Sequence, residues 1–241
     1  MEARPMDTVR IGLEDPRCPP SIGARLGHDA PASLDALGNL DLLRRRKLAV
    51  LCSVKCPGGI ILQSYDLMQR LRRSDLAVVG GFQSPMEREW LAVLLRGPGP
   101  VVLCPARGIE GMRLPSGYWP PLREGRLLIL SCFPDGPDRP TVETALARNR
   151  FVAALADHVL VAHASPGGKT EGLCRELLEV GVPLYTLEDR ANENLLRMGA
   201  RPVRLGQGVT LPWGCQSAEN VRGCPEGGKP LLVLDQIGFD G

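Results

Sequence analysis

The sequence predicts an α/β fold, in which a mostly parallel sheet is wound in both directions and covered by helices on both faces. Short runs rich in Val, Leu and Ala are continuously apolar, which is typical of strands buried on both sides. Amphipathic segments fall between these runs, and such alternation favours a Rossmann-like, doubly wound sheet with right-handed crossovers. The apolar runs are 48–52, 76–80, 101–104, 127–131, 159–164 and 183–187; the amphipathic segments are 60–73, 86–96, 141–156, 170–180 and 190–198.

Composition agrees with a folded globular chain. The 241 residues include 29 basic and 27 acidic side chains, a net charge of +2, and 44% are hydrophobic, which excludes disorder of the whole chain. No apolar run approaches the ~18 residues of a membrane helix. The first residues lack the apolar core of a signal peptide. We therefore expect a cytoplasmic protein without a membrane partner.

Three regions follow from the pattern along the chain. Residues 1–45 are predicted to form an N-terminal arm and short helical pieces, with a turn at Gly38-Asn39. Residues 46–200 are predicted to form the Rossmann-like domain. Residues 201–241 are predicted to form a glycine-rich tail, in which 214–230 are typical of loop and 231–235 are a candidate edge strand.

The cysteines point to reduced thiols rather than to disulfides or a metal site. Several lie within apolar runs, and neither a CxxC pair nor a Cys/His cluster with zinc spacing occurs. We expect no metal and no cofactor. The eight are Cys18, Cys52, Cys56, Cys104, Cys132, Cys174, Cys215 and Cys224.

Polar, glycine-rich loops follow the predicted strands. Ligands of an open parallel sheet bind beyond the carboxyl ends of the strands, near helix N-termini. Each loop alone would equally serve as a tight turn, but together they predict a crevice for a phosphate-bearing ligand. The residues concerned are Ser53, Lys55, Gly80, Gly81, Ser84, Arg107, Gly167, Gly168, Lys169 and Thr170.

Arginine dominates the basic residues. Only four of the 29 are lysines, which leaves 25 arginines. A GC-rich genome and phosphate recognition by guanidinium groups both explain this bias. Arg148, Asn149 and Arg150 lie in the polar, basic N-terminal part of the predicted helix 147–155, whose continuation is apolar. We interpret the arginines as phosphate ligands and the asparagine as a loop anchor, with a solvated helix face as the alternative.

Two nucleotide motifs are absent. GGKT at 167–170 lacks the first glycine of a phosphate-binding P-loop, because that position is His163. A GxGxxG motif does not occur either. ATP hydrolysis and NAD chemistry are therefore not expected.

Four segments, in order, resemble the DNA-processing A family (DprA, also called Smf), over roughly residues 21–190. The most specific is ARNRFVAALADHVLVAHA at 147–164, which is similar to the family's Arg-Asn-Arg helix and following strand. The others are 34–43, 127–134 and 167–187. The resemblance implies a Rossmann-like core that binds single-stranded DNA and loads the RecA recombinase. It also implies a homodimer that acts in DNA uptake (DNA-mediated transformation) and recombination.

The chain departs from the family's motifs at several points. Cys52-Ser53-Val54 stands where the family has Gly-Ser-Arg, so only Ser53 carries over, and Lys55 is the candidate substitute for the arginine charge. The family's glycine loop is replaced by 80–87, and Cys132 replaces the acid of its Ser-Glu-x-Pro segment. A C-terminal winged helix is missing. These departures predict a divergent branch.

A second function stays open, because LOG-type phosphoribohydrolases belong to the same superfamily. Their Pro-Gly-Gly-x-Gly-Thr-x-x-Glu loop is similar to 166–171, and Glu171 is a weak candidate for a general acid or base. The alternative for Glu171 is a helix-start carboxylate favoured by the macrodipole. The two hypotheses are a non-enzymatic DNA-binding protein, with Phe82, Tyr118 and Trp119 as candidates for base stacking, and a nucleotide sensor or nucleoside monophosphate phosphoribohydrolase.

Overall fold

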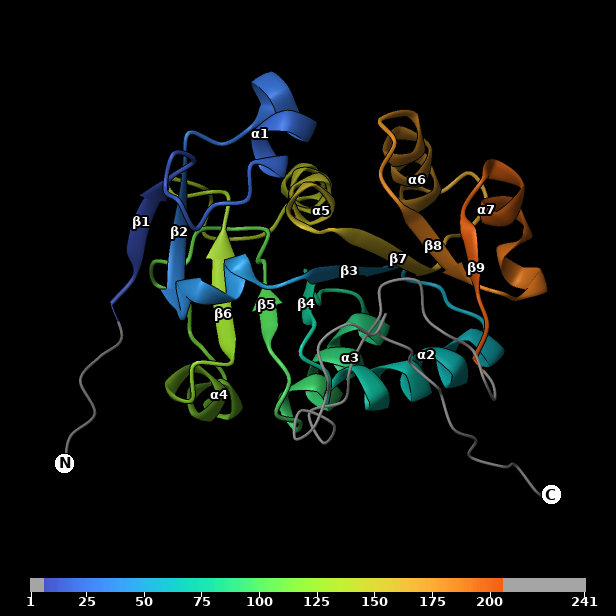
Figure 1. The fold of residues 1–241 in the computed structure, drawn as a ribbon, viewed down its shortest axis with the longest axis horizontal. Coiled ribbons are helices and arrows are strands. Elements are labelled where there is room, and N and C mark those ends of the chain that lie inside the picture. The colour runs from blue at the N-terminus through green and yellow to red at the C-terminus, as the bar shows by residue number, and fades with distance from the viewer. Residues whose placement is uncertain (1–6, 206–241) are drawn as a thin grey trace, which may run out of the picture.

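A computed structural model of the chain describes residues 7–205, whose strands form one nine-stranded sheet in the order β1-β2-β6-β5-β4-β3-β7-β8-β9 (Figure 1). β1 and β2 run antiparallel to their neighbours, and the other pairs are parallel. The strands are β1 Val9–Gly12, β2 Ser33–Gly38, β3 Lys47–Cys52, β4 Ala77–Gly80, β5 Val101–Leu103, β6 Leu127–Ser131, β7 His158–His163, β8 Leu184–Leu187 and β9 Arg201–Val203.

The predicted α/β class is confirmed, and the reason is burial. All six predicted apolar runs form strands, and β3 to β6 are buried at every residue. From β3 the chain builds the sheet outward through β4, β5 and β6. It then returns beside β3 to build β7, β8 and β9 in the other direction. The switch point between β3 and β7 is where open sheets of this kind leave room for ligands.

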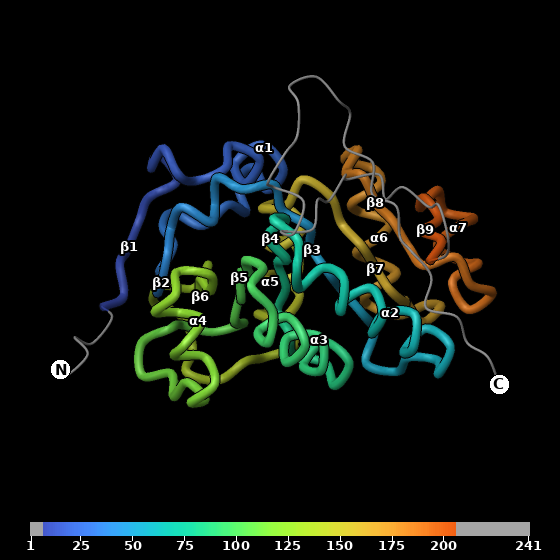
Figure 2. The backbone as a smooth tube through the Cα atoms, turned by 60° about the horizontal axis from the view of Figure 1, so that its bottom comes forward, coloured from blue at the N-terminus to red at the C-terminus, as the bar shows by residue number. Residues whose placement is uncertain are grey.

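Helices cover both faces of the sheet (Figures 1 and 2). Ile60, Trp90 and Leu122 anchor one group of helices to one hydrophobic cluster, and Phe151 and Leu173 lie in the cluster on the opposite face. The first group comprises α2 Gly58–Leu71, α3 Pro85–Leu95 and α4 Trp119–Arg123; the second comprises α1 Ser21–Leu26, α5 Val142–Leu155, α6 Lys169–Glu179 and α7 Glu193–Met198.

Local sequence signals explain where α3 and α5 begin. Ser84 accepts a hydrogen bond from the Glu87 amide, and Pro85 occupies the first helical position of α3. Thr141 caps α5 in the same way through the amide of Thr144, at 3.1 Å. Both helices therefore start directly after the loops that follow a strand.

The N-terminal segment differs from the sequence-based expectation. Helix is found at Ser21–Leu26, but Ser33–Gly38 forms β2 instead of a helical piece. β2 fills the edge of the sheet beside β6, and β1 pairs with its other side. Burial of Leu34, Ala36 and Leu37 between these partners explains why tertiary contacts outweigh local propensity.

The opposite edge of the sheet ends in β9, a strand that was not among the predicted apolar runs. The Val203 carbonyl accepts the Glu188 amide at 2.9 Å, so the backbone polar groups of Val203 point toward β8 and the rest of the sheet. Neighbouring residues of a strand face opposite ways, so the nitrogen of Pro202 faces outward. The candidate edge strand 231–235 lies outside the described residues.

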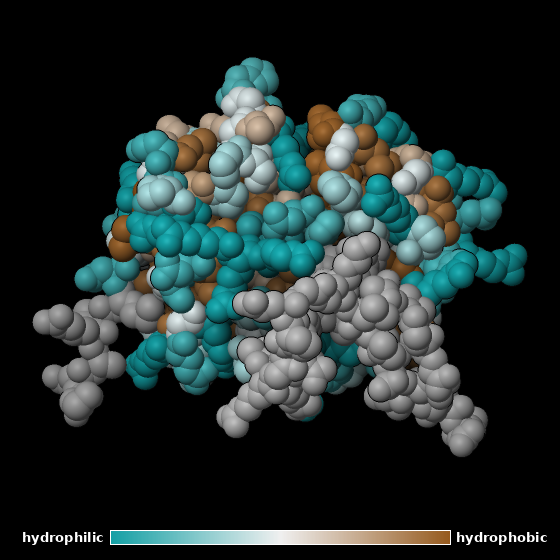
Figure 3. Space-filling model, viewed as in Figure 1, coloured by the Kyte–Doolittle hydropathy of each residue, from teal (hydrophilic) through white to brown (hydrophobic). Residues whose placement is uncertain are grey.

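Within residues 7–205, no helix is long and apolar enough to cross a membrane. Hydrophilic side chains cover most of the face seen in Figure 3, and apolar ones gather over α6. The six cysteines of the described part are free thiols; Cys18, Cys52, Cys104 and Cys174 are buried, as predicted, and Cys56 and Cys132 are half-buried. Cys215 and Cys224 lie outside it.

Candidate functional site

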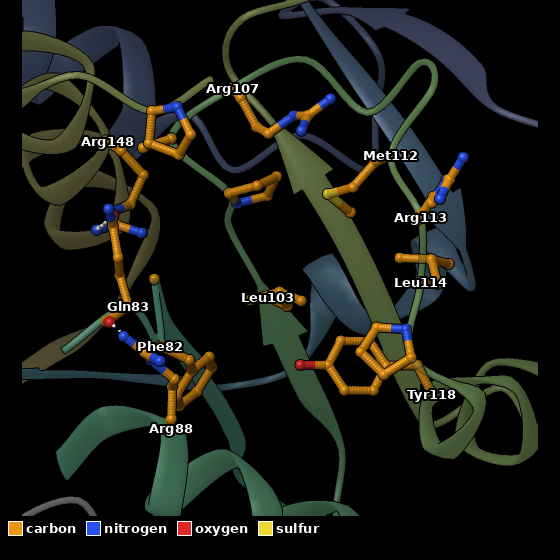
Figure 4. A pocket seen from close by; sticks show the side chains of 15 residues that line it. Phe82, Gln83, Arg88, Leu103, Arg107, Met112, Arg113, Leu114, Tyr118 and Arg148 are labelled. Carbon is orange, nitrogen blue, oxygen red and sulfur yellow. Dashed lines mark hydrogen bonds between the residues drawn. The ribbon is translucent and has the colours of Figure 1, made fainter. Parts of the chain in front are cut away.

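A cavity of about 280 Å³ opens at the carboxyl ends of β4 and β5 (Figure 4). It lies at the edge of the sheet where the sequence predicts a crevice. Its lining comes from the β4–α3 loop and the beginning of α3, from the end of β5 and the long connection after it, and from Pro140 before α5 and Arg148 within α5. The lining residues are Gly81, Phe82, Gln83, Arg88, Leu103, Pro105, Ala106, Arg107, Met112, Arg113, Leu114, Pro115, Tyr118, Pro140 and Arg148.

Arg148 lies on the inner wall of this cavity and is only 3% exposed. Its Nη1 donates to the Cys104 carbonyl at 3.0 Å and its Nη2 to Gln83 Oε1 at 3.0 Å. Its Nε donates to Asn149 Oδ1 at 2.8 Å. Burial lowers the pKa of Arg148, and the Glu87 carboxylate opposes that effect. The guanidinium group therefore ties α5 to the ends of β4 and β5.

The glycine at position 81 makes room for this arginine. A methyl group at Gly81 would lie 1.6 Å from Arg148 Nη1. The next residue, Phe82, is buried and has a φ of 47°, a left-handed conformation that side chains rarely adopt. The unusual backbone places Gln83 where it meets the guanidinium group. Close packing, rather than ligand approach, explains the glycine in the structure.

Glu87 connects the ends of β3 and β4. Its carboxylate is 5% exposed and accepts three backbone N–H groups, from Cys52 and Gln83 at 3.0 Å and from Ser84 at 3.2 Å. Glu87 ends the segment 80–87 that replaces the family's glycine loop, and no role was predicted for it. The Ser-x-x-Glu spacing from Ser84 is a capping-box signal that identifies half of this arrangement.

Three further arginines surround the opening. Arg88 and Arg113 are exposed and Arg107 is half-buried. Arg88 Nε donates to the Gln83 carbonyl at 3.1 Å, and Arg107 Nε to that of Gly108 at 3.2 Å. Among residues 7–205, the terminal nitrogens of both guanidinium groups form no hydrogen bond, so a ligand can bind them. The rim is therefore positively charged.

The opposite wall is apolar and aromatic. Figure 4 shows Met112, Leu114 and Tyr118 across the cavity from Gln83 and Arg88, with Leu103 between the two sides. Tyr118 is half-buried, and burial raises the pKa of its hydroxyl group, which points into the cavity. Among the three stacking candidates, Phe82 and Tyr118 line the cavity, whereas Trp119 packs against the core. A ligand that carries a flat ring and a negatively charged group matches this combination of an aromatic wall and a positively charged rim.

At the switch point, Ser53 joins β3 to β7. Its amide donates to the His163 carbonyl at 2.9 Å, and its Oγ accepts the Ser165 amide at 3.1 Å. Lys55, two residues on, is exposed. Ser53 therefore holds the two strand ends together.

The loop that enters α6 closes on itself. Glu171 Oε2 accepts the Gly167 amide at 2.8 Å and Oε1 accepts Asn194 Nδ2 at 2.6 Å. The Asn194 bond, and then the Gly167 bond, hold the pKa of Glu171 below its ordinary value. Gly168 begins the helix without a side-chain cap. Lys169 is exposed and Thr170 half-buried.

Arg150 lies away from the cavity. Although it is only two residues from Arg148, it is exposed and forms a two-fold ion pair with Glu176 of α6, with both N···O distances at 2.8 Å. It borders a separate groove between α1, α5 and α6. The structure thus brings together Gly80, Gly81, Ser84, Arg107, Arg148 and Asn149, places Ser53, Lys55, Gly167, Gly168, Lys169 and Thr170 farther along the same edge, and separates Arg150 from both groups.

Sequence reasoning missed Arg88 and Arg113. A usable signal for Arg113 was the length of the connection between β5 and α4, since long connections inside compact domains are often functional. Arg88 carries no such signal, because its place depends on the way α3 is set against the strand ends.

A family model described as DNA recombination-mediator protein A matches residues 10–204. DNA processing protein A from Streptococcus pneumoniae is similar in structure, with a TM-score of 0.66, 24% identity and coverage of 81% of this chain and 70% of that chain. The corresponding protein of Helicobacter pylori, whose structure concerns its single-stranded DNA binding mode, gives a TM-score of 0.65 and 20% identity over 82% of this chain and 91% of that chain. No curated protein matches.

Proposed function

This chain belongs to the DNA recombination-mediator protein A family, and from that premise we propose that it binds single-stranded DNA at the cavity beside β4 and β5. The observation that carries the proposal is the pairing of three rim arginines with an apolar, aromatic wall in one cavity. The Helicobacter pylori protein of similar fold has a single-stranded DNA binding mode, which supports the same ligand class here.

The two walls supply the two interactions that single-stranded nucleic acid needs. Guanidinium groups of Arg88, Arg107 and Arg113 contact phosphates, because a planar fork of donors matches phosphate oxygens. The ring of Tyr118 offers a base a stacking surface, which is worth about 1–3 kcal/mol per base. Arg148 supports this site from below, since its own donors are used within the protein.

The test uses the full-length chain and fluorescent oligothymidine at about 50 mM salt, where phosphate contacts are strongest. We expect Arg107→Ala with Arg113→Ala to weaken binding at least tenfold. Arg175→Ala, an exposed arginine on α6, is the matched control and should bind normally. Absence of binding by the unaltered chain, or equal affinity of the cavity and control variants, would overturn the proposal.

A mononucleotide sensor is the second candidate, and the small size of the cavity favours it. Excess mononucleotide should then displace oligothymidine completely and raise the melting temperature of the chain. If oligothymidine binds much more tightly than any mononucleotide, the polymer is the ligand. Release of free base from a nucleoside monophosphate would instead identify the phosphoribohydrolase alternative.

The family also leads us to propose action with the RecA recombinase and assembly as a homodimer. RecA assembly on oligothymidine, measured with and without this chain, tests the first point. Sedimentation equilibrium tests the second. A constant RecA assembly rate and a monomer mass at micromolar concentration would contradict them.

A further inference from the structure

Arginines gather at the other edge of the sheet, where the parallel strands begin. The chain enters β3 through Arg45 and Arg46 and enters β4 through Arg72 and Arg73. Since parallel strands start at the same edge, these residues share one side of the molecule with those that precede β5 and begin β9. We name Arg45, Arg46, Arg72, Arg73, Arg96 and Arg201 the amino-edge arginine surface.

Backbone contacts make the part beside β3, β4 and β5 continuous. The Arg46 carbonyl accepts the Ala77 amide at 2.9 Å, which joins the starts of β3 and β4. The Arg72 carbonyl accepts the Gly99 amide at 2.8 Å, which joins the approaches to β4 and β5. A shallow hollow of about 160 Å³ lies between Arg45, Arg46, Asp75 and Leu76.

His158 extends the surface toward β9. Its ring makes an edge contact with Tyr185, with centroids 5.7 Å apart, and the Arg201 guanidinium carbon lies 5.8 Å from the centre of the same Tyr185 ring. Arg201 Nη1 also donates to the Tyr185 hydroxyl at 3.4 Å. Burial, and then Arg46, lower the pKa of His158, while Asp157 opposes them and Arg201 adds to the lowering. Positive charge from two strands therefore meets at this ring.

Few carboxylates balance these arginines. Asp41, Asp75 and Asp157 are the acidic residues on the approaches to β3, β4, β5, β7 and β9. The carboxylate of Asp157 already accepts the Lys47 amide at 2.7 Å and lies 3.5 Å from Lys47 Nζ. Among the described residues, Arg45 and Arg96 form no ion pair, and both are exposed. The chain as a whole has a net charge of only +2, so this excess is local.

We propose that the amino-edge arginine surface is a second nucleic-acid contact, which binds the phosphate backbone independently of the cavity at the carboxyl edge. Neighbouring strands lie about 4.8 Å apart, so the surface offers a row of guanidinium groups several strands wide. A row of this kind fits a ligand with regularly repeated phosphates better than a single small anion. Contacts to phosphate hold nucleic acid without reading its sequence.

The two surfaces lie at opposite ends of the parallel strands, the cavity at their carboxyl ends and the amino-edge arginine surface at their amino ends. A strand that occupies the cavity reaches the amino-edge arginine surface only by passing around the molecule. The second surface therefore takes a different stretch of nucleic acid, so that one chain holds two segments at once. The proposal does not depend on the cavity being the DNA site.

The main test compares two triple variants of the full-length chain. Arg45→Gln, Arg73→Gln and Arg96→Gln remove three exposed arginines from the surface. Arg175→Gln, Arg190→Gln and Arg197→Gln remove three exposed arginines elsewhere and form the matched control. Both should keep the urea midpoint of the unaltered chain. Binding of a long oligothymidine is measured over a series of salt concentrations.

The edge variant should bind at least tenfold more weakly at low salt. The slope of log affinity against log salt should fall by about 2, since each lost phosphate contact removes about 0.7 for a single strand. The control variant should keep its slope. An edge variant with the affinity and slope of the control overturns the proposal.

Two further arms separate the alternatives. If the edge variant loses binding to vesicles of anionic phospholipid but keeps oligothymidine binding, the surface serves a membrane and the proposal is overturned. If Arg107→Ala with Arg113→Ala leaves oligothymidine binding intact while the edge variant loses it, the cavity proposal fails and this one stands. Residual, salt-sensitive binding of the cavity variant that disappears on adding the edge substitutions supports both.

Discussion

The two halves of the sheet's carboxyl edge start from similar sequences and end differently. In both, a glycine-containing loop leads from a buried strand into a helix, after β4 at Gly81 and after β7 at Gly168. The loop after β4 borders a cavity, and Arg148 reaches into it from another element. The loop after β7 is closed by polar contacts instead: Glu171, in the helix that the loop enters, accepts the Gly167 amide, and Ser53, at the end of β3, accepts that of Ser165.

What separates them is the chain that comes from elsewhere. The long connection between β5 and α4 brings Met112, Leu114 and Tyr118 over the first half. A glycine-rich loop at a strand end therefore does not form a binding site by itself. A cavity forms only where a neighbouring connection, such as that between β5 and α4, covers the loop. Variants of each half can test this distinction.

The largest effect is expected at Arg148. Arg148→Leu leaves the Glu87 carboxylate buried without its nearby cation and the Cys104 carbonyl without its donor. Removing one partner of such a buried group costs about 3 kcal/mol of unfolding free energy. Arg150→Leu, the matched control at an exposed ion pair with Glu176, should cost less than about 1 kcal/mol. Urea denaturation measures both, and equal losses would contradict the structural role of Arg148.

Gly81→Ala should come second. The new methyl group would occupy the position of the guanidinium group and force it out of its bonds, at a cost of about 2 kcal/mol. Gly172→Ala in α6 is the control, because a methyl group there meets nothing within 4 Å and helix propensity favours alanine by up to about 1 kcal/mol. A stable Gly81→Ala variant would show that the loop after β4 can move aside.

The smallest effect is expected at Glu171. Its lowered pKa means that the folded chain favours the ionised form, so the stabilisation is present above the ordinary value of 4.5 and is lost as the pH falls below it. Glu171→Gln should cost about 1 kcal/mol at pH 7. The difference from the unaltered chain should shrink in urea titrations at pH 3.5.

The same variant separates the halves of the edge by function. Oligothymidine binding by Glu171→Gln should equal that of the unaltered chain, with Arg175→Gln as the control. A loss of binding as large as that of the cavity variants would show that the loop after β7 belongs to the same site.

The sequence predicted the central strands because they are buried on both faces, and the helices between them because their apolar residues repeat with helical period. β2 was not predicted, because its burial depends on pairing with β1 on one side and with β6, about 90 residues later, on the other. Gly81 and Arg148 were predicted to lie near the site, but the contact between them depends on how α5 packs against the end of β4, which the sequence pattern does not specify.

The sequence alone was sufficient to predict that the side chains of Arg148 and Arg150 point in different directions. Residues two apart on a helix differ by about 200° in direction, so the two side chains could not face the same cavity. The roles of Arg88 and Arg113 had no such simple rule, because each depends on where a whole element packs.

Pro202 limits how copies of this chain can associate. Its nitrogen faces outward from β9 and carries no hydrogen, so a neighbouring strand finds a gap in the donor row of that border. Continuation of the sheet from one molecule to the next is thereby discouraged at this border, and with it the growth of fibrous aggregates. The border at β1 contains no proline, so pairing of sheets between two copies is left to that side alone, where it ends in a closed pair rather than in an open-ended ribbon.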